Sequence, residues 1–314
     1  MRFVIVSPRQ KYGGAIVLHT LCKNLSELGY DASIYYIGQS YYKKNRRILF
    51  WLKQLYFTVV DFIKSANVKV RGEDALRGDK RYIGYVDESI KGVDRKILPW
   101  VDKETIVVYP DIVYGNFLKA RRVVRWLLYY NRYGEDAYEK NDLFYAYRDV
   151  FNDETFNPQK RILTMSYYDL DLYKRTNYGH REGTCYIIRK GANRDDLPKS
   201  FDGPVIDDLP EREKVAVMNQ CEFCVSYDMQ TCYTSIAAIC GCTSVMIPEK
   251  GKTWNDYKGP GEKHYGVALG FDEAEIEYAK ETASKVLETY KQENQEGKDA
   301  AGKFAQECIK YFEK

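Results

Sequence analysis

The stretch that decides the fold runs over residues 222–248 and reads EFCVSYDMQTCYTSIAAICGCTSVMIP. Residues 222–227 are mostly apolar and predict a buried strand, and residues 243–247 predict a second one. Between them, a polar loop that starts at Asp228 leads into a helix-like stretch that stops at Gly241. A strand, a helix and a second strand in this order form a βαβ unit, whose two strands are expected to be parallel.

The first residues repeat this pattern. Residues 2–6 predict a strand, Gly13 and Gly14 end the following loop, and apolar residues at helical spacing follow from Ala15 to the next strand at 32–37. Further strands are expected at 105–111, 161–166, 184–189 and 265–271, and helices at 41–64, 116–131, 211–220, 272–292 and 298–313. The sequence therefore predicts an α/β fold of two Rossmann-like lobes with a cleft between them.

The restart of strand patterns at RILTMS (161–166), after an irregular stretch, sets the predicted domain boundary. We expect residues 1–155 to form the first lobe and residues 156–296 to form the second. Residues 297–314 are expected to form a final helix that packs back toward the first lobe.

Composition narrows the functional classes. The chain has 314 residues, of which 45% are hydrophobic and 30% are charged, and its formal net charge is +3. This small charge argues against nucleic acid as a partner. The sequence shows no run of about 18 apolar residues and no signal-peptide pattern at its start. We therefore expect a cytoplasmic protein, in which the eight cysteines stay reduced.

The helix after Asp228 is a candidate site for a diphosphate. The start of a helix offers unpaired N–H groups and a partial positive charge, and Thr231, Thr234 and Ser235 add hydroxyl donors there. The alternative is that Asp228 or Thr231 only caps the helix.

A second set of candidates ends the strand at 184–189. Arg189 and Lys190 lie at its carboxyl end, beside Gly191, which permits close backbone approach. Two cations in this position suit a diphosphate whose charge must be neutralised as it leaves. The alternative is a solvated basic turn.

With these residues in place, the chain resembles the GT-B superfamily of glycosyltransferases, in particular bacterial enzymes of polysaccharide biosynthesis. The segments that carry the resemblance are VVYPDIVYGNFLKARRVVRWLLY, within 105–130, and residues 222–271. It implies two Rossmann-like lobes, with the nucleotide-sugar donor held mostly in the second lobe by an Arg and a Lys. It also sets Asp228 at the first position of an acidic-x7-Glu motif, and Ile236 where the family has the Glu that binds the donor ribose.

The resemblance implies a glycosyltransferase that moves a hexose or related sugar from a nucleoside diphosphate to a glycan or lipid-linked glycan. Asp228 would contact the transferred sugar, and Asp111 is a candidate base, with a turn residue as its alternative. Gly13 and Gly14 would approach a phosphate or sugar, or form an ordinary turn. Retention and inversion of the anomeric centre both stay open. Two other classes of protein also stay open. One is a non-catalytic nucleotide- or carbohydrate-binding protein, and the other is a dinucleotide oxidoreductase, against which the absence of G-x-G-x-x-G from this sequence argues.

We expect no metal or other cofactor. Asp169 and Asp171 have an Asp-x-Asp spacing, but such pairs are frequent by chance. The cysteine pairs at 221/224 and 240/242 are interpreted as small buried apolar residues in preference to zinc ligands. Residues 41–64 combine cations with Trp, Leu, Tyr and Phe. They are expected to form a helix that lies on the first lobe. The helix either packs there with its cations in solvent, or it contacts the inner face of a membrane.

Overall fold

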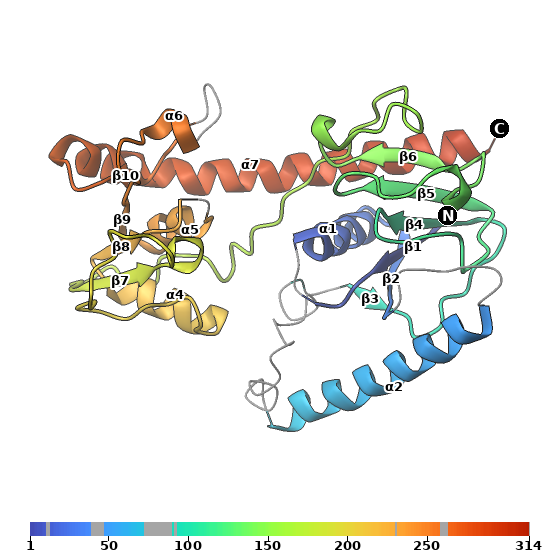
Figure 1. The fold of residues 1–314 in the computed structure, drawn as a ribbon, viewed down its shortest axis with the longest axis horizontal. Helices are drawn as coiled ribbons and strands as arrows, with labels where there is room; N and C mark the ends of the chain where they lie inside the picture. The colour runs from blue at the N-terminus through green and yellow to red at the C-terminus, as the bar shows by residue number, and fades with distance from the viewer. Residues whose placement is uncertain are drawn as a thin grey trace. The chain divides into compact units, whose positions relative to one another are not determined.

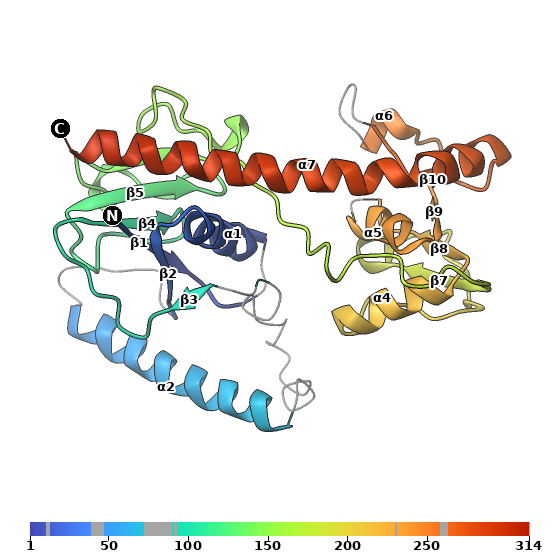
Figure 2. The ribbon, with the colours of Figure 1, turned by 180° about the vertical axis from the view of Figure 1, so that it is seen from behind.

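The computed structural model describes residues 1–10, 13–38, 47–71, 90, 93–229, 231–257 and 263–313. The chain divides into two compact units (Figures 1 and 2). Unit 1 comprises Met1–Tyr167 with Glu293–Lys314, and unit 2 comprises Tyr168–Gln292. Each unit contains its own parallel β-sheet, so the α/β class predicted from the sequence is confirmed.

Unit 1 is built on a six-stranded sheet in the order β3-β2-β1-β4-β5-β6, with every neighbouring pair parallel. Strand order reverses between β1 and β4, the position where doubly wound sheets bind ligands. Its elements are β1 (Arg2–Ser7), α1 (Gly13–Glu27), β2 (Asp31–Tyr36), α2 (Arg47–Arg71), β3 (Asp94–Arg95), β4 (Thr105–Pro110), β5 (Arg122–Leu127), η3 (Glu135–Ala137), β6 (Leu143–Ala146) and η4 (Asp149–Phe151).

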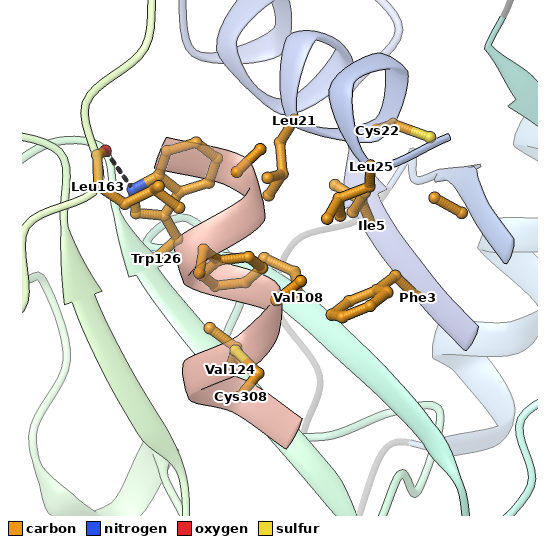
Figure 3. Close-up of a cluster of buried hydrophobic side chains, with 14 of the residues drawn as sticks. Phe3, Ile5, Leu21, Cys22, Leu25, Val108, Val124, Trp126, Leu163 and Cys308 are labelled. Atoms are coloured by element: carbon orange, nitrogen blue, oxygen red, sulfur yellow. Dashed lines mark hydrogen bonds between the residues drawn. The ribbon is translucent and has the colours of Figure 1, made fainter. Parts of the chain in front are cut away.

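Alternating side chains of β1 build both layers of unit 1. Phe3 and Ile5 point to one face and join α1 and the last helix in a single core (Figure 3). Trp126 is buried in that core and donates its indole N–H to the Leu163 carbonyl at 3.2 Å. Val4 and Val6 point to the opposite face, where α2 covers the sheet. Because both faces are covered, the strands read as continuous apolar runs.

Unit 2 has a four-stranded parallel sheet in the order β10-β9-β8-β7. Its elements are β7 (Thr184–Ile187), η5 (Arg189–Gly191), α4 (Glu211–Gln220), β8 (Phe223–Ser226), α5 (Tyr233–Cys240), β9 (Thr243–Met246), α6 (Trp254–Tyr257) and β10 (Val267–Leu269). The βαβ unit at 222–248 is confirmed as β8, α5 and β9, and Gly241 ends α5 with a φ of 95°. Helix α7 (Glu273–Phe312) begins in unit 2 and ends in unit 1.

The helix predicted at 116–131 is wrong, because this segment is a loop followed by β5. Arg121, Arg122 and Arg125 have the spacing of a basic helix face, but Arg125 is buried and paired with Asp142 (2.7 Å). Neutralised in this way, Arg125 fits inside β5, where its neighbours Val124 and Trp126 are apolar and buried.

The predicted strand at 161–166 is also absent, since only an isolated bridge joins Ile162 to Ala146 of β6. This segment belongs to unit 1, and the boundary lies at Tyr167, where 155 was expected. The two helices expected at 272–292 and 298–313 are one helix, α7. Gly297 continues the helix there instead of breaking it, and its backbone packs against Met165.

From Arg47 onward, the helix expected at 41–64 is confirmed as α2, while residues 41–46 lie outside the described ranges. Its Phe50 packs in one cluster with Val4 and Val6, so α2 lies on unit 1 as expected. In the part of the chain that the structure describes, each helix is too short or too polar to cross a bilayer.

Candidate functional site

The loops that follow β7 and β8 meet at the carboxyl edge of the second sheet. The chain leaves β7 through η5, and the backbone of Gly191 lies so close to Tyr227 that a Cβ at 191 would be 2.3 Å from the Tyr227 carbonyl oxygen. Only glycine fits this contact without a shift. The Gly191 expected to permit a close approach is therefore in contact with the exit of β8.

Arg189 is held at this junction by its backbone and by its side chain. The Asp207 carboxylate accepts the N–H groups of Ile188 (2.8 Å) and Arg189 (3.0 Å) and so fixes the end of β7. Arg189 has a φ of 31°, which is uncommon for a residue with a side chain. Its guanidinium carbon lies 5.8 Å from the centre of the Tyr233 ring, and both Arg189 and Lys190 are exposed.

Tyr233 is the first residue of α5, so its contact with Arg189 brings the two predicted parts of the site together. The Tyr233 hydroxyl donates to Glu211 (2.9 Å), and the Tyr173 hydroxyl donates to the other oxygen of the same carboxylate (2.7 Å). Lys214 lies 4.7 Å from the Tyr233 ring centre. Burial, reinforced by the Glu211 carboxylate, raises the pKa of both tyrosines, which therefore stay protonated as hydrogen-bond donors.

Two hydroxyl groups at the start of α5 make local hydrogen bonds. Thr231 Oγ1 accepts the N–H of Tyr233 at 3.2 Å, and the Thr234 hydroxyl donates to the Thr231 carbonyl at 3.2 Å. Ser235 is partly exposed on the same turn. The N-cap of α5 is Cys232, which makes no side-chain cap bond, so Thr231 forms a local turn before the helix and does not cap it. The Thr231 hydroxyl still has its own hydrogen to donate.

Asp228 is only 1% exposed, in contrast to the exposed cations. Its backbone N–H and carbonyl both bond to the Ser226 hydroxyl, which tightens the turn after β8. Ile236, which the resemblance sets at the ribose-binding position, is 2% exposed and packs in the core of unit 2. A carboxylate near α5 comes instead from Glu211.

Arg194 bonds to the backbone that follows β8 and β9. Its side chain is 8% exposed and donates to the carbonyls of Ile247 (2.8 Å) and Pro248 (2.9 Å), while it pairs with Asp196 at 2.6 Å. No strand, helix or motif pattern pointed to Asp207, to Arg194 or to the cluster of Tyr173, Glu211, Lys214 and Tyr233. Arg194 could have been predicted as the third cation of RKGANR (189–194). The cluster around Glu211 could not, because its residues lie far apart in the sequence.

The candidates of unit 1 lie at the ends of adjacent strands, β1 and β4, where the strand order reverses. Asp111 is 6% exposed, and its carboxylate accepts the N–H of Leu128 at 3.1 Å. Burial raises the pKa of the Asp111 carboxyl. A Cβ at Gly14 would lie 3.3 Å from the Leu128 side chain, so Gly14 and Asp111 share one neighbour, while Gly13 faces open space.

Among the residues with described positions, no group of three or more His, Cys, Asp or Glu side chains is arranged to hold a metal ion. The cysteines at 221, 224, 240 and 242 are all buried.

Comparison with known proteins gives a likeness of fold alone. The chain matches no protein-family model. It matches no curated protein. One solved structure similar to it is an alpha-glucosyltransferase in complex with UDP and a 13-mer DNA containing a central A:G mismatch. The sequences are 12% identical, the TM-score is 0.41, and the match covers 95% of this chain and 94% of the other.

This match corrects one expectation. We expected nucleic acid to be excluded as a partner, but the similar structure contains DNA. A net charge of +3 is therefore not sufficient ground for the exclusion, which we withdraw.

Proposed function

We propose that the chain is a glycosyltransferase that binds a nucleoside diphosphate sugar at the carboxyl edge of the second sheet. The observation that carries this proposal is the contact between Arg189 and Tyr233, at 5.8 Å, because it joins the basic turn after β7 to the first turn of α5. The resemblance seen in the sequence suggests a glycan or lipid-linked glycan as the acceptor of a hexose or related sugar.

In this proposal, the leaving diphosphate is neutralised by the protein. When the bond between the sugar and the diphosphate breaks, negative charge grows on the phosphate oxygens. Arg189 and Lys190 supply exposed positive charge, and the N–H groups that begin α5 supply hydrogen bonds and the positive end of the helix dipole. Thr231, Thr234 and Ser235 lie on that turn. No metal enters this account, because these groups supply the stabilising charge.

The two acidic candidates receive separate roles. Asp228, at the end of β8, shapes the turn that leads into α5 and helps to place the transferred sugar. Asp111 is the candidate base for an acceptor hydroxyl in unit 1. Burial raises its pKa, which makes the carboxylate a stronger proton acceptor than an exposed one.

Isothermal titration with a panel of nucleoside diphosphates and the matching nucleosides tests the donor site. Arg189→Ala is expected to weaken diphosphate binding by at least about tenfold, because a hydrogen bond to a charged group is worth roughly 1.5–3 kcal/mol. Nucleoside binding should hardly change. Lys199→Ala, which removes an exposed cation elsewhere in unit 2, is the matched control. Equal losses for the diphosphate and the nucleoside, or no loss for either, would contradict the assignment.

The second candidate is a non-catalytic nucleotide- or carbohydrate-binding protein, which the buried Ile236 favours. The two functions are separated by turnover. A glycosyltransferase releases nucleoside diphosphate from its sugar nucleotide in the presence of an acceptor, whereas a binding protein shows affinity without release.

A further inference from the structure

Helix α2 presents a broad apolar face to solvent. Among its described side chains, the exposed large apolar ones are Ile48, Leu49, Leu52, Leu55, Tyr56, Val59, Phe62 and Ile63. At 3.6 residues per turn, they occupy one continuous arc of about 140° around the helix. A helix on the surface of a soluble domain normally turns polar side chains outward, so this face marks an interaction surface.

The opposite side of α2 fixes the helix to unit 1. Phe50 and Gln54 are buried, and the Gln54 side chain bonds to the backbone of Tyr36 (2.9 Å) and Gly38 (3.0 Å). Asp61 pairs with Arg9 at 2.6 Å. These polar contacts hold the helix in one rotation, so the apolar arc cannot turn inward to be buried against the sheet.

The sequence of α2 is strongly basic. Over residues 47–71 the sequence carries five cations and a single acid, Asp61, which is the residue paired with Arg9. Lys53 is exposed at the border of the apolar arc. A partner that complements this surface is apolar and negatively charged.

A second exposed apolar segment lies next to α2. The connection between β3 and β4 runs beside the helix in both views (Figures 1 and 2), and its Val101 packs in the same cluster as Phe50. Ile97, Leu98 and Trp100 of this connection are exposed. Tryptophan is favoured at the boundary between lipid and water.

We propose that α2 docks on the surface of an anionic membrane, with its axis along the membrane plane. The apolar arc then inserts between headgroups and Lys53 contacts lipid phosphate.

A second copy of the chain fits this surface less well. Ile48, Leu52, Leu55, Val59 and Phe62 alternate at spacings of four and three, as in a coiled coil. However, the exposed arc is wider than such a seam. Among the described side chains of α2 the one acid, Asp61, is paired with Arg9, so two copies would bring like charges together.

Co-sedimentation of the full chain with vesicles tests the proposal. Binding is expected to vesicles of equal parts phosphatidylglycerol and phosphatidylcholine, with much less to phosphatidylcholine alone and a decline with added salt. The double variant Leu55→Ser, Phe62→Ser is expected to bind at least about tenfold more weakly, because two inserted apolar side chains are lost. Lys53→Glu should weaken binding to the anionic vesicles only.

Val150→Ser, at an exposed position outside α2, is the matched control and should bind like the unchanged protein. All of these positions are exposed, and unchanged thermal unfolding would show that each variant is folded. Vesicle binding that is absent, or equal in the double variant, overturns the proposal. So does a dimer in sedimentation velocity that the double variant converts to a monomer, because the occupant of the face would then be a second copy.

Discussion

Replacing Gly191 with alanine tests how the junction between the two loops of unit 2 is built. A Cβ at this position would lie 2.3 Å from the Tyr227 carbonyl oxygen and 2.7 Å from its carbon, where ordinary contact begins at 3.4 Å. Both atoms belong to the backbone, and the Tyr227 N–H is bonded to the Ile187 carbonyl at 2.8 Å. No side-chain rotation relieves the clash, so η5 must move away from the end of β8.

Overpacking of this kind costs about 1–3 kcal/mol. The unfolding temperature of unit 2 is therefore expected to fall by roughly 3–10 °C in differential scanning calorimetry. Movement of η5 also carries Arg189 away from Tyr233. If one charged hydrogen bond to the ligand is lost, affinity for nucleoside diphosphate falls by at least about tenfold in isothermal titration.

Gly179→Ala is the control for this substitution. A Cβ at 179 would meet only the Asn177 side chain, at 3.4 Å, so the stability of this variant should stay within about 0.5 kcal/mol of the unchanged protein. If Gly191→Ala unfolds and binds like the unchanged protein, the close contact between η5 and β8 does not exist and the reasoning is refuted.

Substitutions at three further positions test polar groups of the two units. Burial raises the folded-state pKa of Asp111 above its unfolded value, so ionisation of this carboxyl costs stability as the pH rises above about 4. The stability that Asp111→Asn gains over the unchanged protein should therefore grow with rising pH, and a gain that shrinks would count against this. Asp142→Ala leaves the Arg125 guanidinium buried without its carboxylate and should cost about 3–5 kcal/mol in urea unfolding, and a loss below 1 kcal/mol would contradict a buried ion pair. Tyr233→Ala should weaken nucleoside diphosphate binding more than Tyr233→Phe, because the phenylalanine keeps the ring that contacts Arg189 and loses only the bond to Glu211. Equal titration curves for the two variants would exclude stacking on Arg189 as the role of the ring.

Local patterns were enough to predict much of the second sheet. The strands β7, β8 and β9 and the helices α4 and α5 follow from apolar runs, helical spacing and the stop at Gly241. The rule that ligands meet parallel sheets at the carboxyl ends of strands directed attention to Arg189 and to the start of α5. The structure brings these two together through Tyr233.

Other features depend on contacts that no local pattern reveals. Strand β5 was mistaken for a helix because the charge of Arg125 is cancelled by Asp142, 17 residues away. Tyr173 and Tyr233 meet at Glu211 across separations of 38 and 22 residues. Gly297 lies between the two helices expected at 272–292 and 298–313, yet α7 continues through it, because packing against neighbouring residues outweighs the roughly 1 kcal/mol that glycine costs in a helix.

The reactivity of Cys232 tests the proposed diphosphate site most directly. It is exposed and immediately precedes α5, whereas the other seven cysteines are buried, so a maleimide should label one thiol per native chain quickly. A saturating nucleoside diphosphate at the start of α5 is expected to slow this labelling by at least about tenfold, while the matching nucleoside has little effect. Arg189→Ala should need at least about tenfold more of the diphosphate for the same protection. If a nucleoside diphosphate binds tightly by titration and Cys232 is labelled at an unchanged rate, the diphosphate does not lie at this helix and the central claim is wrong.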